Sequence, residues 1–320
     1  MGALLHKPLR LRGVVAAAVT PLLGGLGPDV PALLRHCLWL LGNGCDGINL
    51  LGTTGEAMSL SVAQRLAVME AVADSDVPVA RVMVGTGASA LDDAALLTHR
   101  ARQLGFAGAL VLPPFYYKNV ADDEVFRFYA TLIERIGEPE LALYLYHFPA
   151  LSGVPISAAL IERLVETCGA TIVGIKDSSG DPEHAASLAR SFPDLDVFPS
   201  AETELAGARL QGFAGCISAT VNVTAPLARI AWDASRSDAA AAAEVDVALS
   251  RLRSAFAAYP LVAAVRFALG ALWEDDRWQR TVPPLGSLSV SDGAALMAAL
   301  GSEPLFRVIF EAVRHKDRTA

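Results

Sequence analysis

Short apolar runs alternate with longer amphipathic segments along the first two thirds of the chain. Each run is almost continuously apolar, which is typical of strands that are buried on both faces of a sheet. The runs are GVVAAAV (13–19), GINLL (47–51), VARVMVG (79–85), GALVL (108–112), LALYLY (141–146), TIVGI (171–175), DVFPS (196–200) and GCISA (215–219). The segments between them, for example 61–74, 89–105 and 122–137, have the periodicity of amphipathic helices.

Eight strand and helix units of about 25 to 30 residues predict a closed parallel (β/α)8 TIM barrel. An open doubly wound sheet is the alternative, but it usually has fewer strands and a glycine-rich first turn, which this sequence lacks. Beyond the eighth run the pattern is helical, over 238–259, 261–275 and 291–316. We therefore expect a catalytic barrel over 1–238 and a C-terminal helical domain over 239–320.

Charge and composition exclude several partners. The net charge is −8 and the basic residues are dispersed, which argues against nucleic-acid binding. The apolar stretch near the start is interrupted by Thr20 and Pro21 and is too short for a membrane span of about 20 residues. Four cysteines lie far apart without a C-x-x-C pair, which predicts free core residues in a reducing compartment, the cytoplasm. The histidines have no metal-ligand spacing, so we expect no metal site.

The carboxyl ends of barrel strands carry the chemistry in this fold, and one lysine follows such an end. Lys176 closes the sixth run in a chain with 22 arginines and four lysines. A desolvated amine can lose its proton and attack a carbonyl carbon, whereas a guanidinium stays charged. The structural alternative is a lysine that caps the strand or pairs with Asp177. Lys118 is a rival nucleophile, but its polar loop predicts a solvated, protonated amine.

Hydroxyl groups follow neighbouring strands. Tyr146 ends the fifth run, one unit before Lys176, and could move protons to and from substrate oxygens. Thr53 and Thr54 follow the second run, where hydroxyl and backbone N–H groups could bind a carboxylate, and Gly52 lets the loop approach closely. His147 could act as a second acid-base group or bind a substrate hydroxyl, although a neutral structural histidine is an equal alternative.

Six motifs, in this order along the chain, resemble those of the dihydrodipicolinate synthase and N-acetylneuraminate lyase family of class I pyruvate-dependent aldolases. The resemblance covers nearly the whole chain. The motifs are TP (20–21), GTTGE (52–56), PPFYY (113–117), YHFPALSG (146–153), GIKDSSGD (174–181) and GCISATVN (215–222).

The resemblance implies a TIM barrel with a C-terminal helical domain, no cofactor, and a homotetramer built of two tight dimers. It implies that Lys176 forms a Schiff base with pyruvate or another 2-oxo acid and that Tyr146 shuttles protons. Thr53 and Thr54 match the pair that holds the pyruvate carboxylate and relays protons. Tyr116 matches the tyrosine that joins the relay across a dimer interface.

Tyr117 is the alternative to Tyr116 in the relay. Four residues depart from the family patterns. Leu151 stands where the lysine-pathway synthases have an arginine that binds the carboxylate of aspartate semialdehyde, which disfavours that activity. The PALSG segment resembles the sialic-acid lyase branch, but Glu202 and Thr203 stand at the Asp-Glu pair of that branch. His147 replaces the usual asparagine.

The sequence therefore predicts a class I aldolase that cleaves or forms a 2-keto-3-deoxy sugar acid, with pyruvate and an aldehyde as the other partners. A dehydratase using the same Schiff base, 4-hydroxy-tetrahydrodipicolinate synthase, N-acetylneuraminate lyase and a non-catalytic ligand-binding member are the alternatives. Besides the threonine pair and Gly52, the residues expected to contact substrate are His147, Ser200, Glu202, Thr203 and Ile217.

Overall fold

Eight parallel strands form a single barrel in the computed structural model, which describes residues 10–138, 140–235 and 239–316. The predicted (β/α)8 fold is confirmed, and every predicted run overlaps one strand, although β5 and β6 extend one and two residues beyond their runs. The strands are β1 (Gly13–Ala17), β2 (Gly47–Leu50), β3 (Val82–Gly85), β4 (Gly108–Val111), β5 (Leu143–His147), β6 (Ile172–Asp177), β7 (Asp196–Pro199) and β8 (Gly215–Ser218).

The strands follow one another around the barrel, in the order β7-β6-β5-β4-β3-β2-β1-β8. The barrel closes between β7 and β8, where the Ala214 N–H donates to the Val197 carbonyl at 2.9 Å. The third strand is shorter than its apolar run, because Val79–Arg81 forms a 3-10 turn before β3. Consecutive parallel neighbours place all carboxyl ends on the same rim.

Helices connect the strands and continue beyond β8. They are α1 (Val30–Gly42), α2 (Val62–Ala73), α3 (Leu91–Gln103), α4 (Asp122–Ile136), α5 (Pro149–Ser152), α6 (Ala158–Cys168), α7 (Pro182–Ser191), α8 (Ala208–Gln211), α9 (Val221–Ala234), α10 (Ala239–Ala257), α11 (Leu261–Trp273), α12 (Val290–Gly301) and α13 (Pro304–Lys316). The last predicted helix, 291–316, is two helices, because Pro304 has no N–H to continue the first and instead begins the second.

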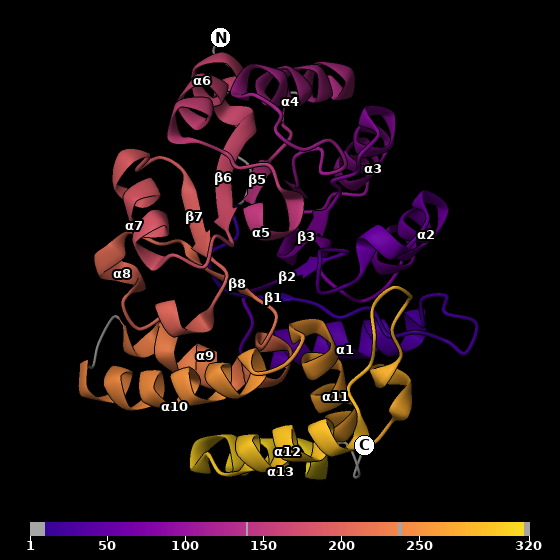
Figure 1. Cartoon of the computed structure of the whole chain (residues 1–320), viewed down its shortest axis with the longest axis vertical. Helices are drawn as coiled ribbons and strands as arrows, with labels where there is room; N and C mark the ends of the chain where they lie inside the picture. Colours follow the sequence, from indigo (N-terminus) through magenta and orange to yellow (C-terminus); the bar gives the residue numbers. More distant parts are fainter. Residues whose placement is uncertain (1–9, 139, 236–238, 317–320) are drawn as a thin grey trace.

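The C-terminal helices α10 to α13 gather on one side of the barrel, beside α1 and α9 (Figure 1). Helix α9 contacts α10, α11 and α13, and so joins the barrel to this group. The predicted domain boundary between residues 238 and 239 falls at 236–238, outside the described residues, and stays a prediction. No single helix among the described residues is long and apolar enough to cross a membrane, and α10 and α11 meet that test only as a pair bent by 111°.

Two apolar cores lie on opposite faces of the strands. The outer core fills the space between strands and helices, and an inner core fills the barrel. The inner core contains Val15, Met83, Leu110, Tyr144, Val173 and Phe198. The barrel interior below the carboxyl ends of the strands is therefore filled by apolar side chains.

Three of the four cysteines, Cys37, Cys45 and Cys216, are buried as free thiols. Burial raises the pKa of Cys37 to about 12.

Candidate active site

Lys176 and Tyr146 lie side by side on neighbouring strands. The two residues are register partners in the parallel pairing of β5 and β6. Both are 5 % exposed, and the Lys176 Nζ lies 4.6 Å from the centroid of the Tyr146 ring. Asp177 faces the other way and accepts hydrogen bonds from the N–H and hydroxyl of Ser179. The sequence alternative, a lysine paired with Asp177, is therefore not what the structure contains.

A bulge in β6 turns Lys176 toward the barrel interior. Leu143 pairs with Ile172, but the next residue of β5, Tyr144, pairs with Gly174, so β6 has one extra residue. Ile172 faces the outer core, and regular alternation would have turned Lys176 outward as well. Gly174 is required here, since a Cβ would lie 2.3 Å from the Asp196 carbonyl oxygen and 2.8 Å from the Tyr144 ring.

The loop after β2 brings two threonines to the same place. The Thr53 hydroxyl lies 3.3 Å from the Tyr146 hydroxyl, and Thr54 is 6 % exposed. Gly52 sits so close to Asn49 that a Cβ would lie 2.6 Å from the Asn49 Nδ2. The lysine, the tyrosine and the threonine pair therefore converge from three strand ends.

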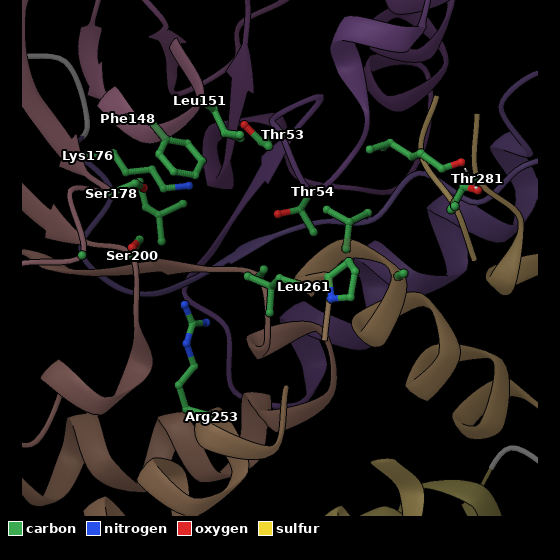
Figure 2. Close-up of a pocket in the computed structure, with 18 of the residues that line it drawn as sticks. Thr53, Thr54, Phe148, Leu151, Lys176, Ser178, Ser200, Arg253, Leu261 and Thr281 are labelled. Atoms are coloured by element: carbon green, nitrogen blue, oxygen red, sulfur yellow. Dashed lines mark hydrogen bonds between the residues drawn. The ribbon is translucent and has the colours of Figure 1, made fainter. Parts of the chain in front are cut away.

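A cavity of about 600 Å³ opens above these groups. Figure 2 shows Lys176, Thr53, Thr54 and Ser200 around it. Its lining residues are Thr53, Thr54, Tyr146, Phe148, Leu151, Lys176, Ser178, Gly180, Ser200, Ile217, Ala219, Arg253, Pro260, Leu261, Val262, Ala263, Thr281, Leu285, Gly286, Ser287 and Leu288. Six of the predicted site residues are among them: Lys176, Tyr146, Thr53, Thr54, Ser200 and Ile217. Gly52 does not line the cavity, but it allows the loop to pass close to Asn49.

Glu202 and Thr203 do not line this cavity. Glu202 is fully buried, and its carboxylate accepts hydrogen bonds from the hydroxyls of Ser218, Thr220 and Thr224. Thr203 lines a separate surface hollow. Of the predicted site residues that follow β7, only Ser200 therefore lines the cavity. The Glu202 side chain instead contacts Ser218 at the end of β8.

His147 also lies outside the cavity, because it follows Tyr146 on the strand and faces the opposite side. Its Nδ1 accepts a hydrogen bond from the Ile156 N–H at 3.0 Å, so the ring proton is on Nε2, 3.9 Å from an Asp177 oxygen. Burial lowers the pKa of His147, although Asp177 opposes this. The histidine is thus held neutral behind the site and does not contact the aldehyde end.

His147 forms a cluster with His184 that the sequence spacing did not predict. The two rings stack with centroids 4.9 Å apart, and the His184 Nδ1 lies 3.3 Å from an Asp177 oxygen. His147, His184 and Asp177 each offer one potential ligand atom, and these three atoms lie within 4.8 Å of one another. The His147 Nδ1 accepts the Ile156 N–H, so the ring proton is on Nε2, and in this tautomer Nε2 offers no lone pair to a metal ion.

No residue of the PPFYYK loop after β4 lines the cavity. Tyr116 and Tyr117 are each 73 % exposed and contact each other edge to face. Lys118 donates hydrogen bonds to the carbonyls of Phe115 and Ser152, which ties this loop to the short helix α5. Lys118 does not line the cavity, so Lys176 is the only lysine at the cavity among the described residues.

The glutamate of GTTGE joins the barrel to the C-terminal helices. Glu56 and Arg266 of α11 are completely buried and form an ion pair. Arg266 also donates to the carbonyls of Thr20 and Trp278, and the second Glu56 oxygen accepts from the Val282 N–H. Burial lowers the pKa of Arg266, and Glu56 opposes that shift. The TP and GTTGE motifs are therefore anchored from the C-terminal side.

Sequence reasoning missed one entire wall of the cavity. Arg253, the start of α11 and the loop 281–288 all line it, although they lie far from any strand end in the sequence. Their helical periodicity gave no sign of a site, because only the packing of α10 and α11 against α9 carries them over the barrel rim.

Comparison with known proteins agrees with the motifs. The model of the dihydrodipicolinate synthetase family matches residues 10–302. An uncharacterized DapA-like lyase from Chloroflexus aurantiacus is 34% identical over 290 residues, which cover 90% of this chain and 95% of the relative.

Solved structures show the same fold. Dihydrodipicolinate synthase from Agrobacterium tumefaciens superposes with a TM-score of 0.84 at 27% identity, covering 91% of this chain and 99% of that one. A prophage protein of the dihydrodipicolinic acid synthase family from E. coli K12, solved with pyruvate, superposes with a TM-score of 0.82 at 26% identity, covering 94% and 99%. Over nearly its whole length, then, this chain belongs to the dihydrodipicolinate synthetase family.

Proposed function

We propose that this lyase of the dihydrodipicolinate synthetase family is a Schiff-base aldolase that interconverts a 2-keto-3-deoxy sugar acid with pyruvate and an aldehyde. One observation carries the proposal. The buried Lys176 Nζ lies against Tyr146, whose hydroxyl is 3.3 Å from that of Thr53, and all three line one cavity. A nucleophilic amine beside a hydroxyl relay is what this reaction requires.

Each group has a role in the cleavage direction. Lys176 Nζ attacks the keto carbon, and loss of water gives a protonated imine. Tyr146 takes the proton from the C4 hydroxyl, the C3–C4 bond breaks, and its electron pair moves toward the imine nitrogen to give an enamine and a free aldehyde. The enamine then takes a proton at C3, and hydrolysis releases pyruvate and the free lysine. Thr53 and Thr54 hold the substrate carboxylate. Thr53, whose hydroxyl lies beside that of Tyr146, also passes on the proton that Tyr146 takes up.

The wall near Leu151 disfavours the lysine-pathway synthase reaction. Leu151 lines the cavity and brings no charge to the place where those synthases have an arginine. Ser200 and Ile217 remain at the aldehyde end, while Glu202, Thr203 and His147 lie elsewhere. A dehydratase is the second candidate, because the same imine can expel a hydroxyl instead of breaking a carbon–carbon bond.

The exposed tyrosine pair supports an assembled enzyme. Tyr116 and Tyr117 place two large aromatic side chains in solvent on one loop, an arrangement suited to contact with another subunit. We propose that the chain works as a cytoplasmic homotetramer in which Tyr116 of one subunit extends the relay of its neighbour.

Borohydride reduction in the presence of pyruvate tests the Schiff base. Peptide mapping by mass spectrometry should place one reduced pyruvate adduct on Lys176 of the folded protein. An unmodified protein would support the non-catalytic alternative, and an adduct on Lys118 would reassign the nucleophile. Product analysis with 2-keto-3-deoxy acids then separates the candidates, since an aldolase releases pyruvate and a dehydratase retains every carbon.

A further inference from the structure

Arg253 reaches the Lys176 cavity from the C-terminal side. It lies on α10, is half-buried, and lines the same cavity as Lys176 and Ser200. Figure 2 shows its side chain rising from the helix with the guanidinium directed toward the side where Ser200 and Lys176 lie. No strand-end motif contains this residue, and Leu151 stands at the position where the synthases of the family have their arginine.

The guanidinium is held in place without being neutralised. Its Nη1 donates to the Thr220 hydroxyl at 3.1 Å, and that hydroxyl in turn donates to the buried Glu202. Among the described residues no carboxylate oxygen lies within 4.0 Å of the guanidinium nitrogens. Glu204 and Asp246 line an adjoining surface hollow with Arg253, and a second adjoining hollow contains Arg253 together with Glu204, Asp177 and Asp181. Most of the five N–H donors of Arg253 therefore remain available to a ligand.

The charge of the cavity favours an anion at both ends. None of the described residues that line it is acidic, and its basic side chains are Lys176 and Arg253. This stands out in a chain whose net charge is −8. A guanidinium binds carboxylate and phosphate groups in bidentate geometry and is weakly hydrated, so it suits a largely apolar wall.

We propose that Arg253 binds an acidic group, carboxylate or phosphate, at the far end of the aldehyde partner. This rests on the proposed function, since it extends the substrate of that same site: a 2-oxo-3-deoxy acid with a second anionic group at the end opposite the keto acid. Arg253 then selects the aldehyde, while Lys176 performs the chemistry. The Thr220 and Glu202 contacts act as the support that aims the guanidinium.

A matched series of three-carbon aldehydes tests the proposal. Wild-type enzyme is assayed with pyruvate and glyceraldehyde, glyceraldehyde 3-phosphate or tartronate semialdehyde, which differ only in the group at the far end. We expect at least one anionic aldehyde to be preferred over glyceraldehyde by about 10- to 100-fold in kcat/KM, mainly through KM. The two anionic arms show whether the acidic group is a carboxylate or a phosphate.

Three variants assign that preference to Arg253. Arg253→Met should lose the preference, and Arg253→Lys should restore part of it. Arg251→Met is the control, because Arg251 is on the same helix but pairs with Glu303 outside the cavity. A wild-type enzyme that prefers glyceraldehyde, or an Arg253→Met variant that keeps the preference, overturns the proposal.

A binding measurement covers the case in which no aldehyde reacts. Calorimetric titration with tartronate, glycerol 3-phosphate and glycerol should show anions binding at least about tenfold tighter than glycerol, with the difference absent in Arg253→Met. Equal binding of all three overturns the proposal. Trapping of pyruvate on Lys176 is measured on the same variants, so failure of the Schiff base and failure of anion selection give separate results.

Discussion

The cavity has two walls, which differ in the polarity of their side chains and in the part of the chain that forms them. The barrel wall carries reactive polar groups at strand ends: Lys176, Tyr146, Thr53 and Thr54. The wall from the C-terminal segment is mostly apolar, formed by residues such as Pro260, Leu261, Leu285 and Leu288, with Arg253 as its one charged group among the described residues. In the proposed mechanism the first wall performs the reaction, and the second encloses and selects the substrate.

The support beneath the two walls differs as well. On the barrel wall, strand register fixes the backbone positions of Tyr146 and Lys176. The C-terminal wall is joined to the barrel by the apolar packing of α10 and α11 on α9 and by buried polar contacts, of which the Glu56–Arg266 pair is fully buried. Changes in the barrel wall should therefore affect turnover, and changes at the junction should affect stability. Four measurements test this division.

The largest effect is expected for Lys176→Arg. The variant keeps a cation in the cavity but cannot form an imine, so turnover should fall by roughly 10,000-fold and pyruvate trapping should disappear. Pyruvate release and mass spectrometry measure the two effects. Lys118→Arg is the control and should still trap pyruvate. Trapping by Lys176→Arg would show that the barrel wall is not the reacting wall.

Tyr146→Phe should separate imine formation from proton transfer. Without the hydroxyl next to Thr53, turnover should fall by about 100- to 10,000-fold, while the borohydride adduct on Lys176 remains. Tyr144→Phe is the matched control on the same strand, since Tyr144 does not line the cavity. Full activity of Tyr146→Phe would remove this tyrosine from the mechanism.

Arg266→Met tests the junction. The change leaves the Glu56 carboxylate buried without its partner, so the free energy of unfolding should fall by about 3 to 5 kcal/mol. Urea unfolding followed by circular dichroism measures it. Arg190→Met removes an exposed pair with Glu183 and should cost less than about 1 kcal/mol. Equal losses in the two variants would mean that the buried pair does not hold the walls together.

The smallest effect is a pH dependence of stability from His36. This ring is fully buried against Trp278 and bonded to Asn222, and burial lowers its pKa from 6.5 to about 4. Well above pH 6.5 the ring is neutral in both the folded and the unfolded chain. As the pH falls toward 4, only the unfolded chain takes up the proton, which should cost the folded state up to about 3 kcal/mol.

His36→Gln can still donate to Asn222 but does not titrate. The difference in unfolding free energy between wild type and His36→Gln should therefore change between pH 7 and pH 4 and stay constant above pH 7. A difference that is the same at every pH would show that the folded chain protonates His36 as readily as the unfolded chain does.

Much of the barrel was predictable because its signals are local. Strand number and the positions of strand ends follow from apolar runs, and the placement of Lys176 one unit after Tyr146 follows from the parallel order. The positions of Glu202 and His147 were not predictable in the same way. His147 is the last residue of β5 and Glu202 comes shortly after β7, but the direction of each side chain depends on contacts with distant residues. Glu202 accepts hydrogen bonds from hydroxyls at and after the end of β8, and His147 accepts one from the Ile156 N–H.

The amino-acid sequence alone was sufficient to predict the fold class and the strand ends at which Lys176 and Tyr146 lie. The direction in which Lys176 faces and the segments that enclose it became known only from the folded chain. Lys176 faces the barrel interior because of a bulge in β6, which places Gly174 against the ring of Tyr144 on the neighbouring strand β5. The position of Arg253 depends on how α10 packs across α9. Both arise from contacts between residues distant in sequence, and periodicity along one segment cannot encode them.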